Sequence, residues 1–208
     1  MVSAWASANS IVLGQRKVDD KSNEITAVPK LLDTLELSGC IITADALNCQ
    51  RTVAKKAIEK GADYVLAVKE NQPRLLKTIQ ALFDDPDEMK WVKCDYHETT
   101  NRGHDHTETC RCWTTSDPDC LQYIASFGDW QGLQSIGMIE ATRSTKEGTT
   151  VKRRYFISSL ASNAKQLLHV SRTYWGIENK LHCSKKGRVS DILEARPFLD
   201  ASRPLCFR

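Results

Sequence analysis

The sequence predicts an α/β fold in which a mixed sheet is flanked by helices. Residues 40–44 and 64–68 are short, almost continuously apolar runs, typical of strands buried on both faces. A helical pattern separates them, and a strand–helix–strand order of this length joins parallel strands. Residues 106–113 then alternate, and 136–142 can pair with 151–158 across a turn, which predicts a β-rich region after the parallel unit.

Shorter elements precede and follow these segments. Residues 2–6 and 11–18 are expected to form a hairpin. Apolar residues at helical spacing across 25–35 predict the next helix, with Pro29 in its opening turn, where a missing N–H has the least effect. Helical periodicity returns across 163–181.

The chain therefore divides into four stretches. We expect a first part of the core, a β-rich insertion, a helix that completes the core, and a basic, disordered tail, at residues 1–88, 89–160, 161–182 and 183–208.

The composition indicates a globular protein of the cytoplasm. Hydrophobic residues make up 41% of the 208 and charged residues 26%, close to the average for globular proteins. No apolar run approaches the roughly 18–20 residues that span a bilayer, the first residues lack a leader pattern, and no membrane partner is expected.

The eight cysteines are scattered, which favours reduced thiols. Seven of the basic residues lie from Lys180 onward against three acids, so the net charge of +3 is weak evidence for a DNA-binding face.

Two carboxylates are candidates for chemistry. Asp45 directly follows the first buried strand, and open α/β sheets bind ligands at the carboxyl ends of their strands. Asp is also a favoured N-cap, so Asp45 alternatively caps the next helix. Glu178 lies among apolar residues of the last helix, where a buried carboxylate needs a cation; alternatively it is solvated and pairs with Lys180 or Arg172. On pattern alone, the capping and solvated interpretations are favoured.

Other polar residues offer weaker signals. Lys69 and Asn71 follow the second buried strand where a helix begins, and helix N–H groups there could contact phosphates. They could equally form a loop and a cap. Arg154 and Arg172 are basic positions that could touch a DNA backbone, but isolated basic residues usually belong to an ordinary surface.

A zinc site is a further alternative. His104 and His106 precede Cys110 and Cys112, and zinc binds both residue types. However, the two cysteines share one strand face and the usual paired knuckles are absent, so the pattern does not favour zinc.

Five segments in order resemble one family, the H-repeat-associated DDE transposases of bacterial insertion sequences. They run from about Val2 to His182 and are Lys21–Ile25, Ile42–Ala46 with Cys49–Gln50, Asp63–Lys69 with Asn71–Gln72, Arg154–Leu160 and Tyr174–His182. The resemblance implies an RNase H-like core with a β-rich insertion before the last catalytic helix. It also implies phosphodiester cleavage and strand transfer on DNA by three carboxylates that hold two divalent ions, Mg²⁺ or Mn²⁺, with no organic cofactor.

The resemblance assigns roles to particular residues. Asp45 matches the second carboxylate of the family and Glu178 the third, which reverses the interpretation from pattern alone. The signature around Glu178 includes Tyr174, Asn179 and Lys180, and basic residues there would contact phosphate.

The sequence also departs from the family at both ends. The family's first aspartate lies on a strand upstream of residues 2–6, and after His182 the family pattern gives way to Cys183 and a basic stretch. We therefore expect a truncated transposase that lacks the first strand, leaves a sheet edge bare and cannot cleave DNA alone. The alternative is a non-catalytic regulatory fragment that binds DNA, a second copy of itself or an intact transposase.

Overall fold

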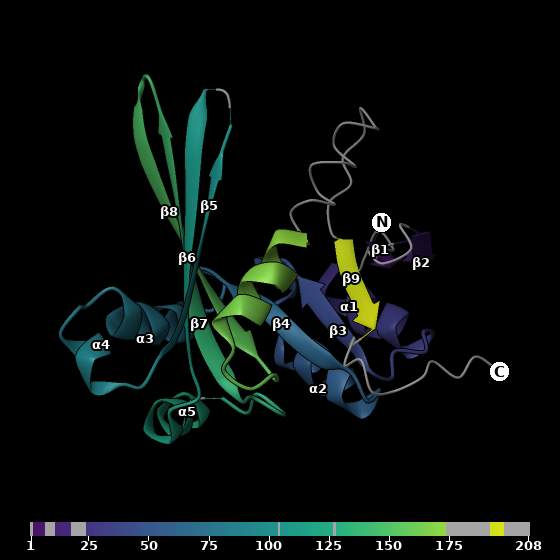
Figure 1. Cartoon of the computed structure of the whole chain (residues 1–208). Helices are drawn as coiled ribbons and strands as arrows, with labels where there is room; N and C mark the ends of the chain where they lie inside the picture. Colours follow the sequence, from purple (N-terminus) through teal and green to yellow (C-terminus); the bar gives the residue numbers. More distant parts are fainter. Residues whose placement is uncertain are drawn as a thin grey trace.

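The computed structural model describes six stretches of the chain, which are residues 2–6, 11–17, 24–103, 105–126, 128–173 and 192–197. Within them the strands form one nine-stranded sheet in the order β2-β1-β9-β3-β4-β8-β7-β6-β5. Helices pack on both faces of this sheet (Figure 1). The predicted mixed α/β fold is confirmed.

The central parallel unit has the predicted order. Its elements are β3 (Cys40–Ala44), the short 3-10 helix η1 (Ala46–Asn48), α2 (Arg51–Glu59) and β4 (Asp63–Val68). β3 and β4 pair in parallel with Ile42 opposite Tyr64. Beyond α2 the chain turns at Gly61, whose φ of 68° suits a residue without a Cβ.

The N-terminal hairpin is confirmed as β1 (Val2–Ala6) and β2 (Ile11–Arg16), which pair antiparallel. The helix that follows, α1, spans Glu24–Asp33 and contains Pro29 in its interior. The expectation that Pro29 lies in the opening turn is therefore wrong. Val28 and Leu32 are buried, so packing against the sheet offsets the backbone hydrogen bond that an interior proline removes.

Strand β9 (Ile192–Pro197) lies between β1 and β3, parallel to β1 and antiparallel to β3. These six residues fall inside the tail that was expected to be disordered, and β1 is paired on both sides instead of leaving a bare edge. The physical reason is that β1 and β3 each present an unpaired ladder of N–H and C=O groups, and one strand between them satisfies both.

The β-rich region is continuous with the core sheet. α3 (Pro73–Phe83) and α4 (Glu88–Trp91) lead into it. The region itself comprises β5 (Asp95–Arg102), β6 (His106–Thr115), α5 (Pro118–Ala125), β7 (Ser135–Thr145) and β8 (Gly148–Ser158). The predicted pairing of β7 with β8 is confirmed, since Ile136 is opposite Ile157 and Thr142 opposite Val151. β8 also pairs with β4, so the insertion extends the core sheet, and β5 to β8 project from the body as a long ribbon (Figure 1).

Each face of the sheet has its own apolar cluster. The larger cluster packs α1, α2, α3 and α5 against one face. On the other face, a helical segment at 164–173 buries Leu167 and Leu168 against strands β3, β4, β6, β7 and β8. A Cβ at Gly137 in β7 would stand 2.5 Å from Leu167 Cδ2 and 2.9 Å from the carbonyl oxygen of Trp113. Only glycine therefore lets this helical segment approach the sheet so closely.

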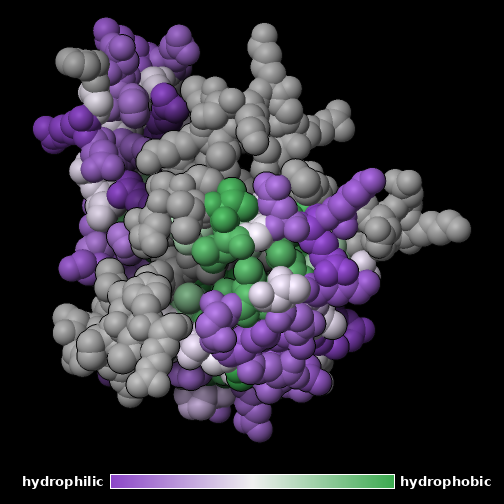
Figure 2. All heavy atoms as spheres, turned by 90° about the vertical axis from the view of Figure 1, so that its right-hand side faces the viewer, coloured by the Kyte–Doolittle hydropathy of each residue, from purple (hydrophilic) through white to green (hydrophobic). Residues whose placement is uncertain are grey.

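Apolar atoms gather in the middle of the side of the molecule seen in Figure 2, with hydrophilic residues below them and to their right. Strand β2 lies at this end of the sheet and exposes Val12 by 46% and Leu13 by 38%.

None of the helices in the described ranges is both long enough and apolar enough to span a bilayer.

Candidate functional site

A pocket of ≈ 140 Å³ lies where β3 and β4 end, on the sheet face that the helical segment 164–173 covers. Its polar lining includes Asp45, Lys69, Arg154 and Ser171. Three of these four residues were candidates from the sequence. The fold brings them together because parallel strands present their carboxyl ends at one sheet edge and β8 runs antiparallel beside β4.

Asp45 is half-buried and follows β3 directly. Its Oδ1 accepts hydrogen bonds from the backbone N–H of Asn48 at 3.2 Å and from Asn48 Nδ2 at 3.1 Å. Asp45 thus caps η1, while the N-cap position of α2 is Gln50. Both bonds fall on Oδ1, so Oδ2 is outside the cap and can bind a cation. Capping and ligand binding are compatible here.

The loop after β4 holds the loop that carries Asp45. Asn71 Nδ2 donates to the carbonyl oxygen of Ala46, and Gln72 Nε2 donates to that of Cys49 at 2.9 Å. The two strand ends are therefore joined by side-chain amides. The side chain of Asn71, a candidate for DNA contact, is thus bonded to the backbone of the residue after Asp45.

Lys69 and Arg154 bring positive charge to the pocket. Val68 of β4 is opposite Tyr155 of the antiparallel strand β8. Lys69 follows Val68 and Arg154 precedes Tyr155, so these two basic residues are neighbours at the same end of the paired strands. Lys69 is exposed and Arg154 is half-buried. The pocket therefore combines one carboxylate with two cations, an arrangement that suits a phosphate together with a divalent ion.

Cys49 lies close to this site but is a poor ligand. It is fully buried, and burial together with the negative charge of Asp45 raises the pKa of its thiol to about 12. The thiolate, and not the thiol, binds metals. The loop therefore offers an oxygen ligand, which favours a hard cation such as Mg²⁺ over a soft one.

The helical segment 164–173 contributes Ser171 to the pocket and is tied to the ribbon through Arg172. Arg172 Nη2 donates to Cys110 Sγ at 3.5 Å, so this candidate for DNA contact is in contact with β6. Ser171 was not identified from the sequence. No local pattern singles it out, because its surroundings come from strands that are far away in the sequence.

Four further candidates are not described by the structure. Glu178, Tyr174, Asn179 and Lys180 fall outside the described residues. In the described stretches, no three or more His, Cys, Asp or Glu side chains are grouped so that they could hold a metal.

The residues of the zinc alternative do not form one described cluster. His104 is outside the described residues, while Cys110 and Cys112 are buried in the apolar cluster beneath the helical segment 164–173. Burial raises the pKa of Cys112 to about 12 and also raises the pKa of Cys110. Both thiols are therefore protonated at neutral pH.

Comparison with known proteins places this chain in a family. Residues 1–191 match the family model described as a transposase DDE domain. The chain is 38% identical to "Putative transposase YncI" of Escherichia coli O157:H7, over 98% of this chain and 50% of that protein. It is 36% identical to "H repeat-associated putative transposase YhhI" of Escherichia coli K12, over 88% and 48%.

The chain belongs to the family of transposase DDE domains. It is similar to the H repeat-associated group of that family and spans about half the length of these relatives. The match to YncI covers 98% of the chain and therefore extends into the segment after His182. No solved structure matches it.

Proposed function

We propose that this chain acts in DNA transposition, in the domain that cleaves phosphodiester bonds and transfers strands at the ends of an insertion sequence. The observation that carries the proposal is the pocket that combines Asp45, Lys69 and Arg154 at the carboxyl ends of two parallel strands. Membership of the DDE family supports it. Since its substrate would be DNA, we also propose a cytoplasmic location.

We further propose that Asp45 and Glu178 hold a divalent ion, Mg²⁺ or Mn²⁺. Dependence on a divalent metal is what the family implies in general, and carboxylate oxygens are the ligands that such ions prefer. When bound, the ion would activate a nucleophilic oxygen and stabilise the leaving oxygen. Asn48 orients the carboxylate of Asp45 through Oδ1.

The signature around Glu178 extends this proposal. We propose that the helix expected across 163–181 carries Glu178 two turns after Ser171, on the same face. We propose that Tyr174, Asn179 and Lys180 contact DNA beside it, together with Lys69.

We also retain the division into a core at 1–88, an insertion at 89–160 and a catalytic helix at 161–182 as a proposal.

A second candidate function is binding without cleavage. In the part of the chain that the structure describes, Asp45 belongs to no group of three potential metal ligands. The chain would then regulate transposition by binding DNA, a second copy or an intact transposase.

The first experiment measures DNA binding by fluorescence anisotropy. The probe is a labelled duplex with the terminal repeat of the element, titrated in Mg²⁺ and in EDTA. We expect Mg²⁺ to tighten binding in the wild type but not in Asp45→Ala. Lys69→Ala should weaken binding in both buffers and reduce the salt slope by about 1. Lys77→Ala, which removes an exposed lysine of α3, is the matched control and should bind as the wild type does.

A plasmid carrying the terminal repeats separates the two functions. Mg²⁺-dependent nicking that Asp45→Ala abolishes supports catalysis. DNA binding without nicking supports the regulatory function. Failure to bind the duplex in either buffer would overturn both.

A further inference from the structure

The hydroxyl of Ser171 is buried without a hydrogen-bond partner among the described residues. Ser171 is only 3% exposed, and a buried donor without an acceptor is destabilising. A hydroxyl inside a helix commonly bonds the carbonyl four residues back. Thr173 does this, since its Oγ1 donates to the carbonyl oxygen of His169 at 3.0 Å. Ser171, two residues earlier, makes no such bond, and it lines the pocket instead.

The pocket limits what can accept this hydrogen bond. Its ≈ 140 Å³ is well below the roughly 300–1,000 Å³ of pockets that enclose small-molecule ligands. A single phosphate group is a better match than a whole cofactor. Lys69 and Arg154 supply positive charge on the same lining, and a charge-assisted bond to a phosphate oxygen is stronger than a neutral one.

The surrounding fold holds Ser171 in place before any ligand arrives. Gly137 permits the close approach of the helical segment, Leu167 and Leu168 bury its apolar face, and Arg172 bonds Cys110 of β6. A donor that is fixed in advance loses little freedom on binding.

We propose that Ser171 binds phosphate: its Oγ–H donates to a non-bridging oxygen of a DNA backbone phosphate whose charge Lys69 and Arg154 balance. This inference rests on the proposed function and deepens it, because it names a residue that fixes the phosphate beside Asp45. Ser171 exchanges no proton and contacts no metal in this role. It sets the position of the phosphate.

The test compares Ser171→Ala with Thr173→Ala in EDTA, so that neither metal nor cleavage enters. Binding is measured with two probes at constant ionic strength: the labelled duplex by anisotropy, and inorganic phosphate by the rise in melting temperature. We expect Ser171→Ala to weaken duplex binding about tenfold and to reduce the protection by phosphate. Its own melting temperature should equal or exceed that of the wild type, because the unsatisfied donor is gone and alanine favours the helix.

Thr173→Ala removes a hydroxyl from the same helical segment outside the pocket, so its duplex affinity should match the wild type. Ser171→Thr keeps a hydroxyl and should retain most of the affinity. Unchanged duplex affinity in Ser171→Ala overturns the proposal, and weakening confined to inorganic phosphate overturns the assignment to DNA. Because no divalent ion is present, an affinity loss in Ser171→Ala supports this inference even where Asp45→Ala shows no Mg²⁺ effect and the plasmid is not nicked.

Discussion

The two halves of the sheet are stabilised by different means. In the core half, β4 buries Tyr64, Leu66 and Val68 beneath α2 and α3. In the ribbon half, most residues of β5 are exposed and polar. Strand β8 belongs to both halves, since it is exposed from Gly148 to Arg153 and buried from Tyr155 onward. The change from exposed to buried residues falls at Arg154, which lines the candidate site.

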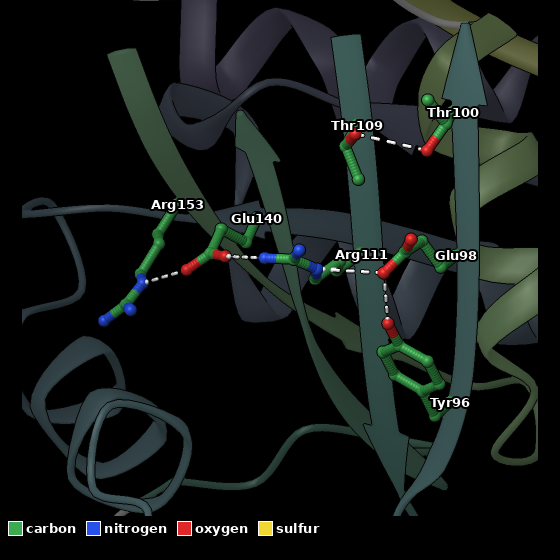
Figure 3. A network of polar contacts seen from close by, with 7 residues as sticks. All are labelled: Tyr96, Glu98, Thr100, Thr109, Arg111, Glu140 and Arg153. Carbon is green, nitrogen blue, oxygen red and sulfur yellow. Dashed lines mark hydrogen bonds and ion pairs between the residues drawn. The ribbon is translucent and has the colours of Figure 1, made fainter. Parts of the chain in front are cut away.

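The ribbon is linked by a ladder of charged and polar side chains that crosses four strands (Figure 3). Tyr96 donates to Glu98 at 2.6 Å, and Arg111 Nε donates to the same carboxylate at 2.9 Å. Arg111 and Arg153 both donate to Glu140, at 3.4 and 2.9 Å. The Tyr96 hydroxyl and Arg111 hold the pKa of Glu98 below its ordinary value.

The comparison shows that the core half and the ribbon half have different structural roles. Burial in the core half fixes the strand ends where Asp45 and Lys69 meet, whereas cross-strand pairs keep the ribbon ordered while its surface remains polar. A substitution should therefore have a large effect in one half and a small effect in the other, even within one strand.

The largest expected effect is on Ile157 of β8, which is fully buried. Ile157→Ala should lower the free energy of unfolding by about 2–5 kcal/mol, because it leaves a cavity in the larger apolar cluster. Val151→Ala, in the exposed part of the same strand, should change it by about 0.5 kcal/mol at most. Urea denaturation measures both, and similar losses for the two variants would contradict the comparison.

A smaller effect follows from alkaline pH through Cys49 in the core half. Burial raises its pKa from 9.0 to about 12 in the folded chain. Above pH 9 the unfolded chain loses this proton first, so the unfolding free energy falls as pH rises toward 12. Near pH 10 the linkage amounts to roughly 1.4 kcal/mol. Urea denaturation between pH 8 and 10 should give a shallower decline in Cys49→Ala than in the wild type; equal slopes would show that this thiol is not responsible.

The smallest effect is expected at Glu140 in the ribbon half. Glu140→Ala leaves Arg111 and Arg153 without their shared carboxylate, so the unfolding free energy should fall by about 1 kcal/mol. The loss should shrink in 1 M salt, which screens partly exposed pairs. Glu147→Ala, in the exposed turn of the β7–β8 hairpin, is the control and should have no measurable effect. A loss that is independent of salt would point to packing instead of charge.

The sequence predicts those parts of the fold that local pattern determines. The continuous apolar runs predicted β3 and β4 as parallel strands, and the turn between residues 142 and 151 predicted the pairing of β7 with β8; both are confirmed. Asp45 and Lys69 were found because each directly follows a buried strand. Two kinds of feature were not accessible. β5 is polar throughout and becomes a strand only through its pairing with β6, and Ser171 acquires its environment from strands far away in the sequence.

Strand β9 gives the chain a late step in folding. It joins β1 to β3 although nearly the whole sequence lies between it and β1, and most of the sequence between it and β3. Pairings of such high sequence separation form slowly, because loop closure precedes the gain from contact. During synthesis β3, β4 and the ribbon can assemble first, while the hairpin β1–β2 joins the sheet only when residues 192–197 emerge. Until then, the edges of β1 and β3 are open to a strand from another chain.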